Sequence, residues 1–464
     1  MAAKIVLLSP YELGRQPFAL AEPAAWLREA GFEVRCVDLA VEQLEQPAFA
    51  GARLVALYLG MHTATRIAVQ ALPRIRAMAP HAWLCAYGLY APVNAELLGR
   101  LGVGSVLGGE SEPALLELAE GLRDGETPHG GRARVSVDKI TFRVPERSGL
   151  PPLERYARLV LPDGAERTMG FAEASRGCKH LCRHCPVVPV YGGRFRVVPV
   201  DVVLADIRQQ VAAGARHISF GDPDFWNGPG HARRVVRALD EEFPDITYDA
   251  TIKIEHLIAN ADLVDELAQT GCLFVTSAVE SVDDAVLARL DKGHTGADFD
   301  RAARLLADAG IALAPTFVAF TPWTSLEGYL ALLERLVELA LVESVPPIQL
   351  AIRLLVPAGS RLLELEDFAA GLEPFDADML GYPWHHRDAR VDALQTRVQE
   401  VVEDAEARGL PRRETFARIW RLAHAACSRT APALPAHLGD PIPRHSEAWY
   451  CCAEPTERQV ARFS

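Results

Sequence analysis

The sequence predicts an α/β protein in which two β/α units are followed by a helical region and a tail. Residues 1–125 alternate short apolar runs with amphipathic helical patterns. Residues 126–165 are polar and rich in arginine, glycine and proline, as in a linker, and residues 166–357 repeat the β/α alternation. Such alternation is typical of parallel sheets covered by helices. Residues 358–430 are predicted to be helical, and residues 431–464 to form the tail.

The composition is that of a soluble globular protein. The chain has 464 residues, of which 49% are hydrophobic and 23% charged, enough for two or three domains. A net charge of −13 without a long basic run argues against nucleic acid or a membrane as partner. We expect neither a signal peptide nor a transmembrane helix. Nine cysteines in this length do not suggest a disulfide scaffold, so we predict a reducing, cytoplasmic location.

The first β/α series predicts a parallel, doubly wound, flavodoxin-like sheet. The expected strands are Lys4–Ser9, Glu33–Leu39, Leu54–Gly60, Ala82–Tyr87 and Ser105–Gly108. Amphipathic patterns at Glu22–Ala30 and Arg66–Met78 predict helices between them. Ligands of such sheets bind at the carboxyl ends of the strands. The glycine-rich turn Gly108–Pro113 lies at one of these ends.

The second series predicts a partial barrel of six β/α units. Its strands are expected to begin near Thr168, His217, Thr247, Leu273, Leu313 and Gln349. Helices are expected at Val202–Ala213 and Asp298–Ala309, and, beyond the barrel, at Ala389–Ala407 and Arg413–Cys427. Barrel chemistry belongs at the carboxyl ends of the strands.

A cysteine run follows the first strand of this barrel. Cys178, Cys182 and Cys185 have the spacing C-x3-C-x2-C. Three thiolates on one loop can bind three irons of a cubane cluster, whereas electron-transfer ferredoxins normally supply four cysteines per cluster. The fourth iron is then open to a small molecule that chelates through an amine and a carboxylate. The alternative is a zinc site, which usually needs a second cysteine pair or histidines at set spacing.

This run resembles the signature of radical S-adenosylmethionine (SAM) enzymes. The resemblance implies a [4Fe–4S] cluster on Cys178, Cys182 and Cys185, SAM as the second cofactor, and a partial (β/α)6 barrel. The order of elements in residues 1–125 resembles the cobalamin-binding domains that precede many such barrels. The Asp-x-His-x-x-Gly loop of classical cobalamin domains is missing, and His62 is the histidine at a strand end. Cobalamin binding therefore stays open, beside a vestigial or substrate-shaping domain.

The resemblance assigns further cofactor-binding residues to the barrel. His184 takes the place where the family usually has an aromatic residue near the adenine. Asp222 and Asp224 follow the second strand, where a carboxylate would receive the methionine ammonium of SAM. The alternative role of such an aspartate is a turn or a helix cap.

The third and fourth strands supply the remaining candidates. Lys253 follows the third strand, where relatives place a basic residue near the SAM carboxylate. Glu280, in a Glu-Ser turn after the fourth strand, would accept hydrogen bonds from SAM. Arg289, Lys292 and Gly293 continue the match. Each residue alone is equally consistent with a surface or turn position.

The tail carries the second informative motif, Trp449-Tyr450-Cys451-Cys452-Ala453-Glu454-Pro455. Adjacent cysteines in a polar tail are a redox liability unless they are used. The ending resembles the CUAEP/CCAEP radical SAM group, in which some members carry selenocysteine at the position of Cys452. We predict that Cys451 and Cys452 are catalytic and hold a thiophilic, arsenic-type acceptor. Alternatives are a redox pair, a second metal site helped by Cys427, His424 or His445, and a buried structural pair.

The sequence thus predicts a radical SAM transferase that modifies or alkylates a small molecule and takes electrons from a flavodoxin or ferredoxin. A cobalamin-dependent radical SAM methyltransferase is the alternative enzyme. A non-catalytic iron–sulfur redox or metal sensor is the alternative of another class.

Overall fold

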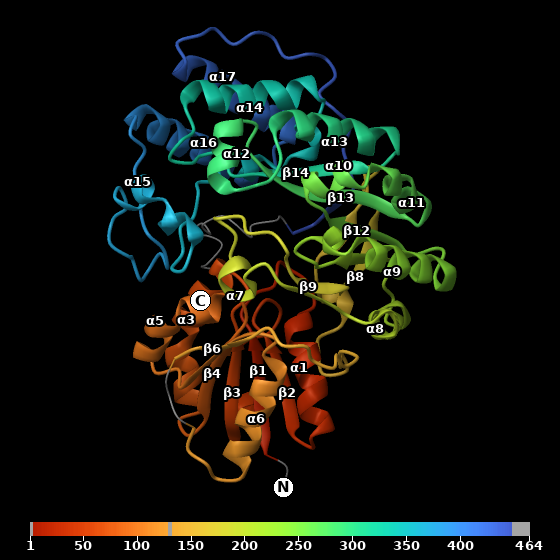
Figure 1. Cartoon of the computed structure of the whole chain (residues 1–464), viewed down its shortest axis with the longest axis vertical. Coiled ribbons are helices and arrows are strands. Elements are labelled where there is room, and N and C mark those ends of the chain that lie inside the picture. Colours follow the sequence, from red (N-terminus) through yellow and green to blue (C-terminus); the bar gives the residue numbers. More distant parts are fainter. Residues whose placement is uncertain (1–2, 129–131, 448–464) are drawn as a thin grey trace.

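The computed structural model describes residues 3–128 and 132–447. The first β/α unit lies at one end of the molecule and the second at the other, and the carboxyl ends of both sheets face a shared interface (Figure 1). Within these residues no helix combines the length and apolar character that a membrane span needs.

The first unit is the predicted doubly wound sheet. Its parallel strands have the order β2-β1-β3-β4-β5-β6, which extends the flavodoxin-like order. The strands are β1 Lys4–Ser9, β2 Glu33–Asp38, β3 Ala52–Tyr58, β4 Trp83–Tyr87, β5 Ser105–Gly109 and β6 Arg134–Ser136. The helices are α1 Phe18–Glu29, α2 Gln46–Phe49, α3 His62–Met78, α4 Tyr90–Val93, α5 Ala95–Arg100 and α6 Glu112–Arg123.

Strand β1 shows why this sheet needs helices on both faces. Val6 and Leu8 belong to one apolar cluster, while Ile5 and Leu7 belong to another. Successive strand residues point to opposite faces, so a strand that is apolar throughout must be covered on both.

The second unit is a curled, mainly parallel sheet with the strand order β14-β13-β12-β11-β8-β7-β15. Strands β8 and β11–β14 are parallel, and β7 and β15 add antiparallel edges. The strands are β7 Arg158–Val160, β8 Glu166–Ala172, β11 His217–Phe220, β12 Thr247–Thr251, β13 Cys272–Glu280, β14 Ala312–Phe317 and β15 Arg444–His445, with a small pair β9 Ser175–Gly177 and β10 Phe195–Val197.

Helices cover the outside of this sheet (Figure 1). They are α8 Val200–Ala212, α9 Pro229–Glu242, α10 Ile254–Ala259, α11 Val264–Gln269, α12 Asp284–Leu290, α13 Gly296–Asp308 and α14 Leu326–Glu338. The short helix α7 Val188–Tyr191 lies instead between the two units, near β5. The region beyond the barrel contains α15 Glu366–Ala369, α16 Ala389–Arg408 and α17 Arg412–Ala426. The last two agree with the predicted helices, and α17 packs against α14 and α16.

The predicted sixth barrel strand near Gln349 is wrong. The structure has a 3-10 turn, Pro347–Leu350, followed by a single bridge between Phe320 and Arg353. The adjacent prolines 346 and 347 lack the N–H groups that a ladder needs. The Gln349 side chain also takes a partner that a strand would use, because its Oε1 accepts from the Phe317 N–H at 3.0 Å.

The segment between the two units ties them together through Arg147. Its guanidinium is buried and donates to Asp206 of α8, at 2.5 and 2.8 Å, and to the Phe171 carbonyl of β8 at 2.7 Å. It also reaches the Gln16 side chain of the first unit at 2.8 Å. The same segment gives β6 to one sheet and β7 to the other. The interface is therefore held by specific polar contacts.

Candidate active site

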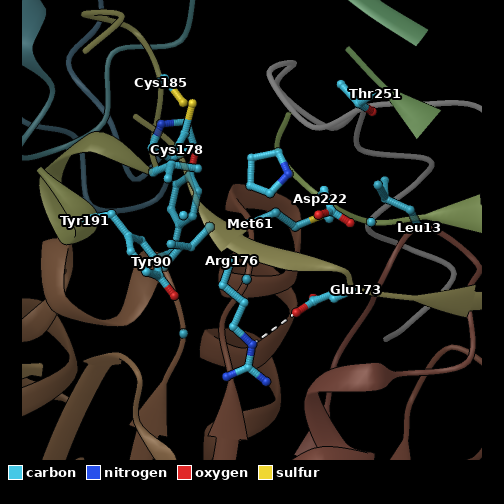
Figure 2. A pocket seen from close by; sticks show the side chains of 18 of the residues that line it. Leu13, Met61, Tyr90, Glu173, Arg176, Cys178, Cys185, Tyr191, Asp222 and Thr251 are labelled. Atoms are coloured by element: carbon cyan, nitrogen blue, oxygen red, sulfur yellow. Dashed lines mark hydrogen bonds and ion pairs between the residues drawn. The ribbon is translucent and has the colours of Figure 1, made fainter. Parts of the chain in front are cut away.

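A cavity of about 340 Å³ lies between the two units. The first unit contributes the loops after β1, β3, β4 and β5, and the second contributes the cysteine loop and the ends of β8 and β11–β14. Figure 2 shows Cys178 and Cys185 on one side of the cavity and Asp222 and Thr251 on the other, with Arg176 and Glu173 below them. Both sheets thus present their carboxyl ends to one space, where ligands of such sheets bind.

The cysteine loop begins directly after β9, and its three cysteines all line the cavity. Gly177 has φ 73°, and a Cβ there would stand 2.4 Å from the Tyr191 ring. Only glycine accepts this left-handed turn without strain. Asn227 fixes the loop further: its Oδ1 accepts from the Lys179 N–H at 3.1 Å, and its Nδ2 donates to the Gly177 carbonyl at 3.2 Å.

Burial makes the free thiols poor acids. It raises the pKa of Cys178 to about 11 and that of Cys185 to about 12. Two ammonium groups oppose this effect: Lys253 Nζ lies 3.8 Å from Cys182 Sγ, and Lys292 lowers the pKa of Cys185. A buried thiolate therefore needs cations, and a metal that binds it displaces the proton outright.

His184, Glu280 and Lys292 form a buried charged group beside the cysteines. Glu280 Oε1 lies 3.0 Å from His184 Nε2 and 3.3 Å from Lys292 Nζ. Burial raises the pKa of Glu280, but Lys292 and His184 outweigh it and bring the pKa down to about 2. Glu280 has φ 67°, a conformation that costs a non-glycine residue about 1–3 kcal/mol. All three side chains line the cavity.

Asp222 lines the cavity, but its carboxylate is already engaged. It accepts from the Ser175 hydroxyl at 2.6 Å and from the Ala174 N–H at 3.0 Å. Burial raises its pKa to about 7 although these hydrogen bonds lower it. The contacts show that Asp222 holds the chain that leads into the cysteine loop.

Three other predicted residues differ in their position relative to the cavity. Lys253 lies in the cavity wall, while Asp224 is fully buried behind it, next to His180 and His256. Arg289 lies outside the cavity lining, on the surface of α12, where it pairs with Asp367 at 2.6 Å. The Arg289 carbonyl accepts from Arg183 of the cysteine loop at 2.9 Å, but the Arg289 side chain does not line the cavity.

Sequence reasoning missed the acidic floor of the cavity, which surrounds Arg176. This guanidinium, with 11% of the side chain exposed, contacts Glu112 at 2.6 Å, Glu110 and Glu173 at 3.2 Å, and Glu22 at 3.4 Å. Burial raises the pKa of Glu173 to about 7 although Arg176 lowers it. The four carboxylates come from both units, so no local sequence motif could have predicted this group.

His62 of the first unit faces away from the cavity lining. Its Nε2 contacts the Met379 carbonyl at 2.5 Å, and burial lowers its pKa to about 4. The first unit lines the cavity with aromatic and apolar side chains, among them Leu13, Met61 and Tyr90, beside the polar residues Glu12, Arg15, Ser111 and Glu112. Such a surface fits a flat hydrophobic macrocycle, and its described residues offer no imidazole or thiol to a cobalt ion.

Cys451 and Cys452 lie outside the described residues, but the segment before them is placed. Strand β15 pairs with β7, and His445 Nε2 lies 3.0 Å from Asp249 Oδ1. Glu447 accepts from the Tyr11 hydroxyl at 2.6 Å. Tyr11 precedes Glu12 and Leu13, which line the cavity, so the described chain ends beside the cavity.

The donor set fits a cubane cluster with one open iron. Cys178, Cys182 and Cys185 line the same cavity wall, and Lys253 and Lys292 supply positive charge beside them. Soft thiolates are the ligands that iron–sulfur clusters take. His184 Nδ1 is buried and has no hydrogen-bond partner among the described residues, so one polar atom of the site is left for a ligand.

Comparisons with known proteins agree with this geometry. Residues 173–322 match the family model of the Radical SAM superfamily. The chain is 28% identical over 162 residues to tRNA-2-methylthio-N(6)-dimethylallyladenosine synthase of Chlorobium luteolum, covering 33% of this chain and 36% of that protein. It is 24% identical over 195 residues to bacteriochlorophyllide d C-12(1)-methyltransferase of Chlorobaculum tepidum, covering 41% and 40%. The chain thus spans well under half the length of these relatives.

Two solved structures share most of the fold. The radical SAM methyltransferase TsrM of Kitasatospora setae, with tryptophan and a SAM analogue bound, has a TM-score of 0.65 at 18% identity, covering 80% of this chain and 77% of that one. The cobalamin-dependent radical SAM enzyme OxsB, with aqua-cobalamin and SAM bound, has a TM-score of 0.68 at 15% identity, covering 87% and 67%. These two structures, at 18% and 15% identity, share the fold of this chain, and residues 173–322 are the part that matches the radical SAM enzyme superfamily.

Proposed function

We propose that this chain cleaves SAM reductively at a [4Fe–4S] cluster and uses the resulting carbon radical to modify a small-molecule substrate. The observation that carries the proposal is the loop of three thiols that opens into a cavity between two sheets. A bound cluster would supply the electron that breaks a C–S bond of the sulfonium. The protein has to bind, orient and exclude water.

The cavity residues support specific roles. Lys253, 3.8 Å from Cys182 Sγ, would offset the charge of the thiolates and meet the carboxylate of SAM. Glu280, kept ionised by Lys292 and His184, would accept hydrogen bonds from hydroxyl groups of SAM. His184 presents a flat ring in the same wall, suited to stacking on the adenine. These assignments require that the buried charged side chains keep partners of opposite charge when the cluster and SAM are bound.

We further propose that Cys451 and Cys452 belong to the active site and hold a thiophilic acceptor of the arsenic type. The support is the placement of Glu447 at Tyr11, beside residues that line the cavity. Cys451 follows Glu447 by four residues, which can span up to about 14 Å when extended. Soft thiols bind soft elements, and the ending resembles the CUAEP/CCAEP group.

The second candidate is a cobalamin-dependent radical SAM methyltransferase. The shared fold with TsrM and OxsB favours it, as does the apolar cavity face of the first unit at Leu13, Met61 and Tyr90. Under this function the macrocycle would lie on that face without a ligand from the described residues. Cobalamin that stays with the purified chain at about one per chain would support it.

The test is product analysis of SAM in the reduced, reconstituted enzyme with and without arsenite. 5′-Deoxyadenosine would indicate adenosyl-radical chemistry on a C–H substrate. Methylthioadenosine that rises with arsenite would indicate transfer of the aminocarboxypropyl group. Cys451→Ser and Cys452→Ser should abolish the arsenite effect, while Cys427→Ser is the matched control and should not. Absence of any SAM cleavage in chains with a full cluster would contradict the enzyme and favour a sensor.

A further inference from the structure

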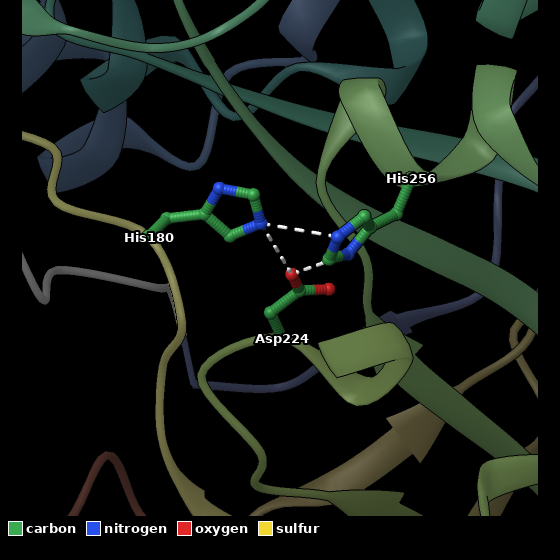
Figure 3. Close-up of side chains that lie close together, drawn as sticks. All are labelled: His180, Asp224 and His256. Atoms are coloured by element: carbon green, nitrogen blue, oxygen red, sulfur yellow. Dashed lines mark hydrogen bonds and ion pairs between the residues drawn. The ribbon is translucent and has the colours of Figure 1, made fainter. Parts of the chain in front are cut away.

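Behind the cysteine loop lies a second group of ligand-type side chains, formed by His180, Asp224 and His256. His180 comes from within the cysteine loop, Asp224 follows β11, and His256 lies on α10. Figure 3 shows the three side chains pointing toward one common position. One donor atom from each lies within 4.8 Å of the others. The cavity lining does not include these residues, so the group is distinct from the proposed SAM site.

The three side chains bring candidate ligand atoms close together, although His256 turns a different ring nitrogen toward each of its two neighbours. His180 Nε2 lies 3.1 Å from His256 Nε2 and 3.8 Å from Asp224 Oδ2, and His256 Nδ1 lies 2.6 Å from the same oxygen. Zinc bonds to histidine and carboxylate of about 2.0–2.2 Å place tetrahedral donors about 3.3 Å apart. A cation that binds His256 through one of its two nitrogens would reach all three residues after the side chains shift.

Hydrogen bonds alone do not account for this group. Asp224 Oδ2 is fully buried and, despite its short distance to His256 Nδ1, has no hydrogen bond of acceptable angle among the described residues. Its other oxygen is used by the Trp226 and Lys253 N–H groups, at 3.3 Å each. A buried carboxylate oxygen without a donor is unfavourable. A small cation between this oxygen and the two imidazoles would give the carboxylate the partner that hydrogen bonds do not supply.

A second His-Asp-His group in the same barrel provides a contrast. Asp249 Oδ1 lies 2.9 Å from His217 Nε2 and 3.0 Å from His445 Nε2, and its Oδ2 accepts from the Ser219 hydroxyl at 3.2 Å. Every oxygen of this carboxylate has a hydrogen-bond donor, so the group is complete without an ion. The Asp224 group has the same composition, but one oxygen of its carboxylate has no hydrogen-bond donor among the described residues.

The surroundings of His180 match those of a metal ligand. Its Nδ1 lies 3.3 Å from Glu255 Oε2, while its Nε2 points into the group. A carboxylate on the outer nitrogen is the usual arrangement that orients a ligating histidine. His180 retains 15% of its side-chain exposure and Glu255 39%, which gives an ion a path from solvent.

We propose that His180, Asp224 and His256 bind one divalent transition cation, of which Zn²⁺ is the reference. Imidazole and carboxylate suit this class of ion, and a water would complete the coordination. The cation would tie the cysteine loop to the end of β11 and to α10. The proposal does not depend on the reaction assigned to the cavity.

The test is zinc binding by the full chain with its iron–sulfur cluster in place. The protein is reconstituted anaerobically, stripped of loose metal, titrated with Zn²⁺ and desalted. We expect about one zinc per chain, with X-ray absorption showing only nitrogen and oxygen ligands near 2.0–2.1 Å. His180→Gln and His256→Gln should each reduce the zinc content at least tenfold. His445→Gln, from the hydrogen-bonded group, is the matched control and should keep it.

Two further measurements make the outcome decisive. Iron content and circular dichroism show whether each variant retains its cluster and fold, and His180→Gln alters the most exposed of the three residues. Equal zinc content in His180→Gln and the wild type would overturn the proposal. Zinc–sulfur distances near 2.3 Å would also overturn it, because they would place the zinc on thiols. A wild-type chain that binds no zinc would overturn it as well and would leave a proton shared between the histidines. SAM cleavage is read separately, so failure here leaves the proposed function unaffected.

Discussion

The buried pair of Glu280 and Lys292 gives the sharpest energetic prediction. Replacement of Glu280 by Gln leaves the Lys292 ammonium fully buried without its carboxylate partner. The Glu280 pKa of about 2 in the folded chain, against an ordinary value of 4.5, corresponds to about 3 kcal/mol. Broken buried pairs cost about 3–5 kcal/mol. We therefore expect Glu280→Gln to lower the free energy of unfolding of the second unit by about 3 kcal/mol.

The assay is urea unfolding of the cluster-free chain under reducing conditions, for Glu280→Gln, Lys292→Met and the double variant. Because the two side chains share one interaction, the double variant should lose less than the sum of the two single losses. The contribution of Glu280 should be complete above about pH 4.5 and disappear as the pH falls toward 2, since its pKa is lower in the folded state. Single losses under about 0.5 kcal/mol, or strictly additive losses, would refute the reasoning.

Three further predictions address the interface, the cofactor site and the tail. Arg176→Met should leave four carboxylates, three of them buried, without their shared cation. The two units should then separate, seen as faster limited proteolysis between them at neutral pH than at pH 5. Lys253→Met should weaken SAM binding at least tenfold in equilibrium dialysis, whereas Arg289→Ala, on the surface, should change it less than twofold; equal effects would contradict the placement. Tyr11→Phe removes the contact to Glu447 and should increase alkylation of the tail thiols by iodoacetamide, while unchanged labelling would contradict tail docking.

The fold was predictable where one sequence pattern controls one element. Apolar strands at regular spacing identified the doubly wound sheet and most of the barrel, and α16 and α17 followed from their amphipathic patterns. The prediction of a sixth barrel strand was wrong for two reasons. Pro347 has no N–H group to donate to a neighbouring strand, and the side chain of Gln349 accepts the hydrogen bond of the Phe317 N–H. An apolar pattern contains no information about either effect.

The sequence allowed prediction only of those parts of the site whose residues lie close together along the chain. Cys178, Cys182 and Cys185 are neighbours in sequence, so their spacing alone indicated a cluster. The ligand-type group of His180, Asp224 and His256 joins residues 44 and 76 positions apart, and Arg176 collects carboxylates from both units. Such groups depend on how the units fold over one another, and a single sequence holds no local sign of them.

Strand-end carboxylates explain how the cysteine loop is held. Asp222 binds Ser175 just before the loop, Asp224 lies 3.8 Å from His180 inside it, and Glu280 contacts His184 just before its last cysteine. Asp222 and Glu280 thus hold the two ends of the loop by hydrogen bonds, while Asp224 lies beside its middle. A cluster tolerates little misplacement of its ligands, so these acids serve first to position the thiols.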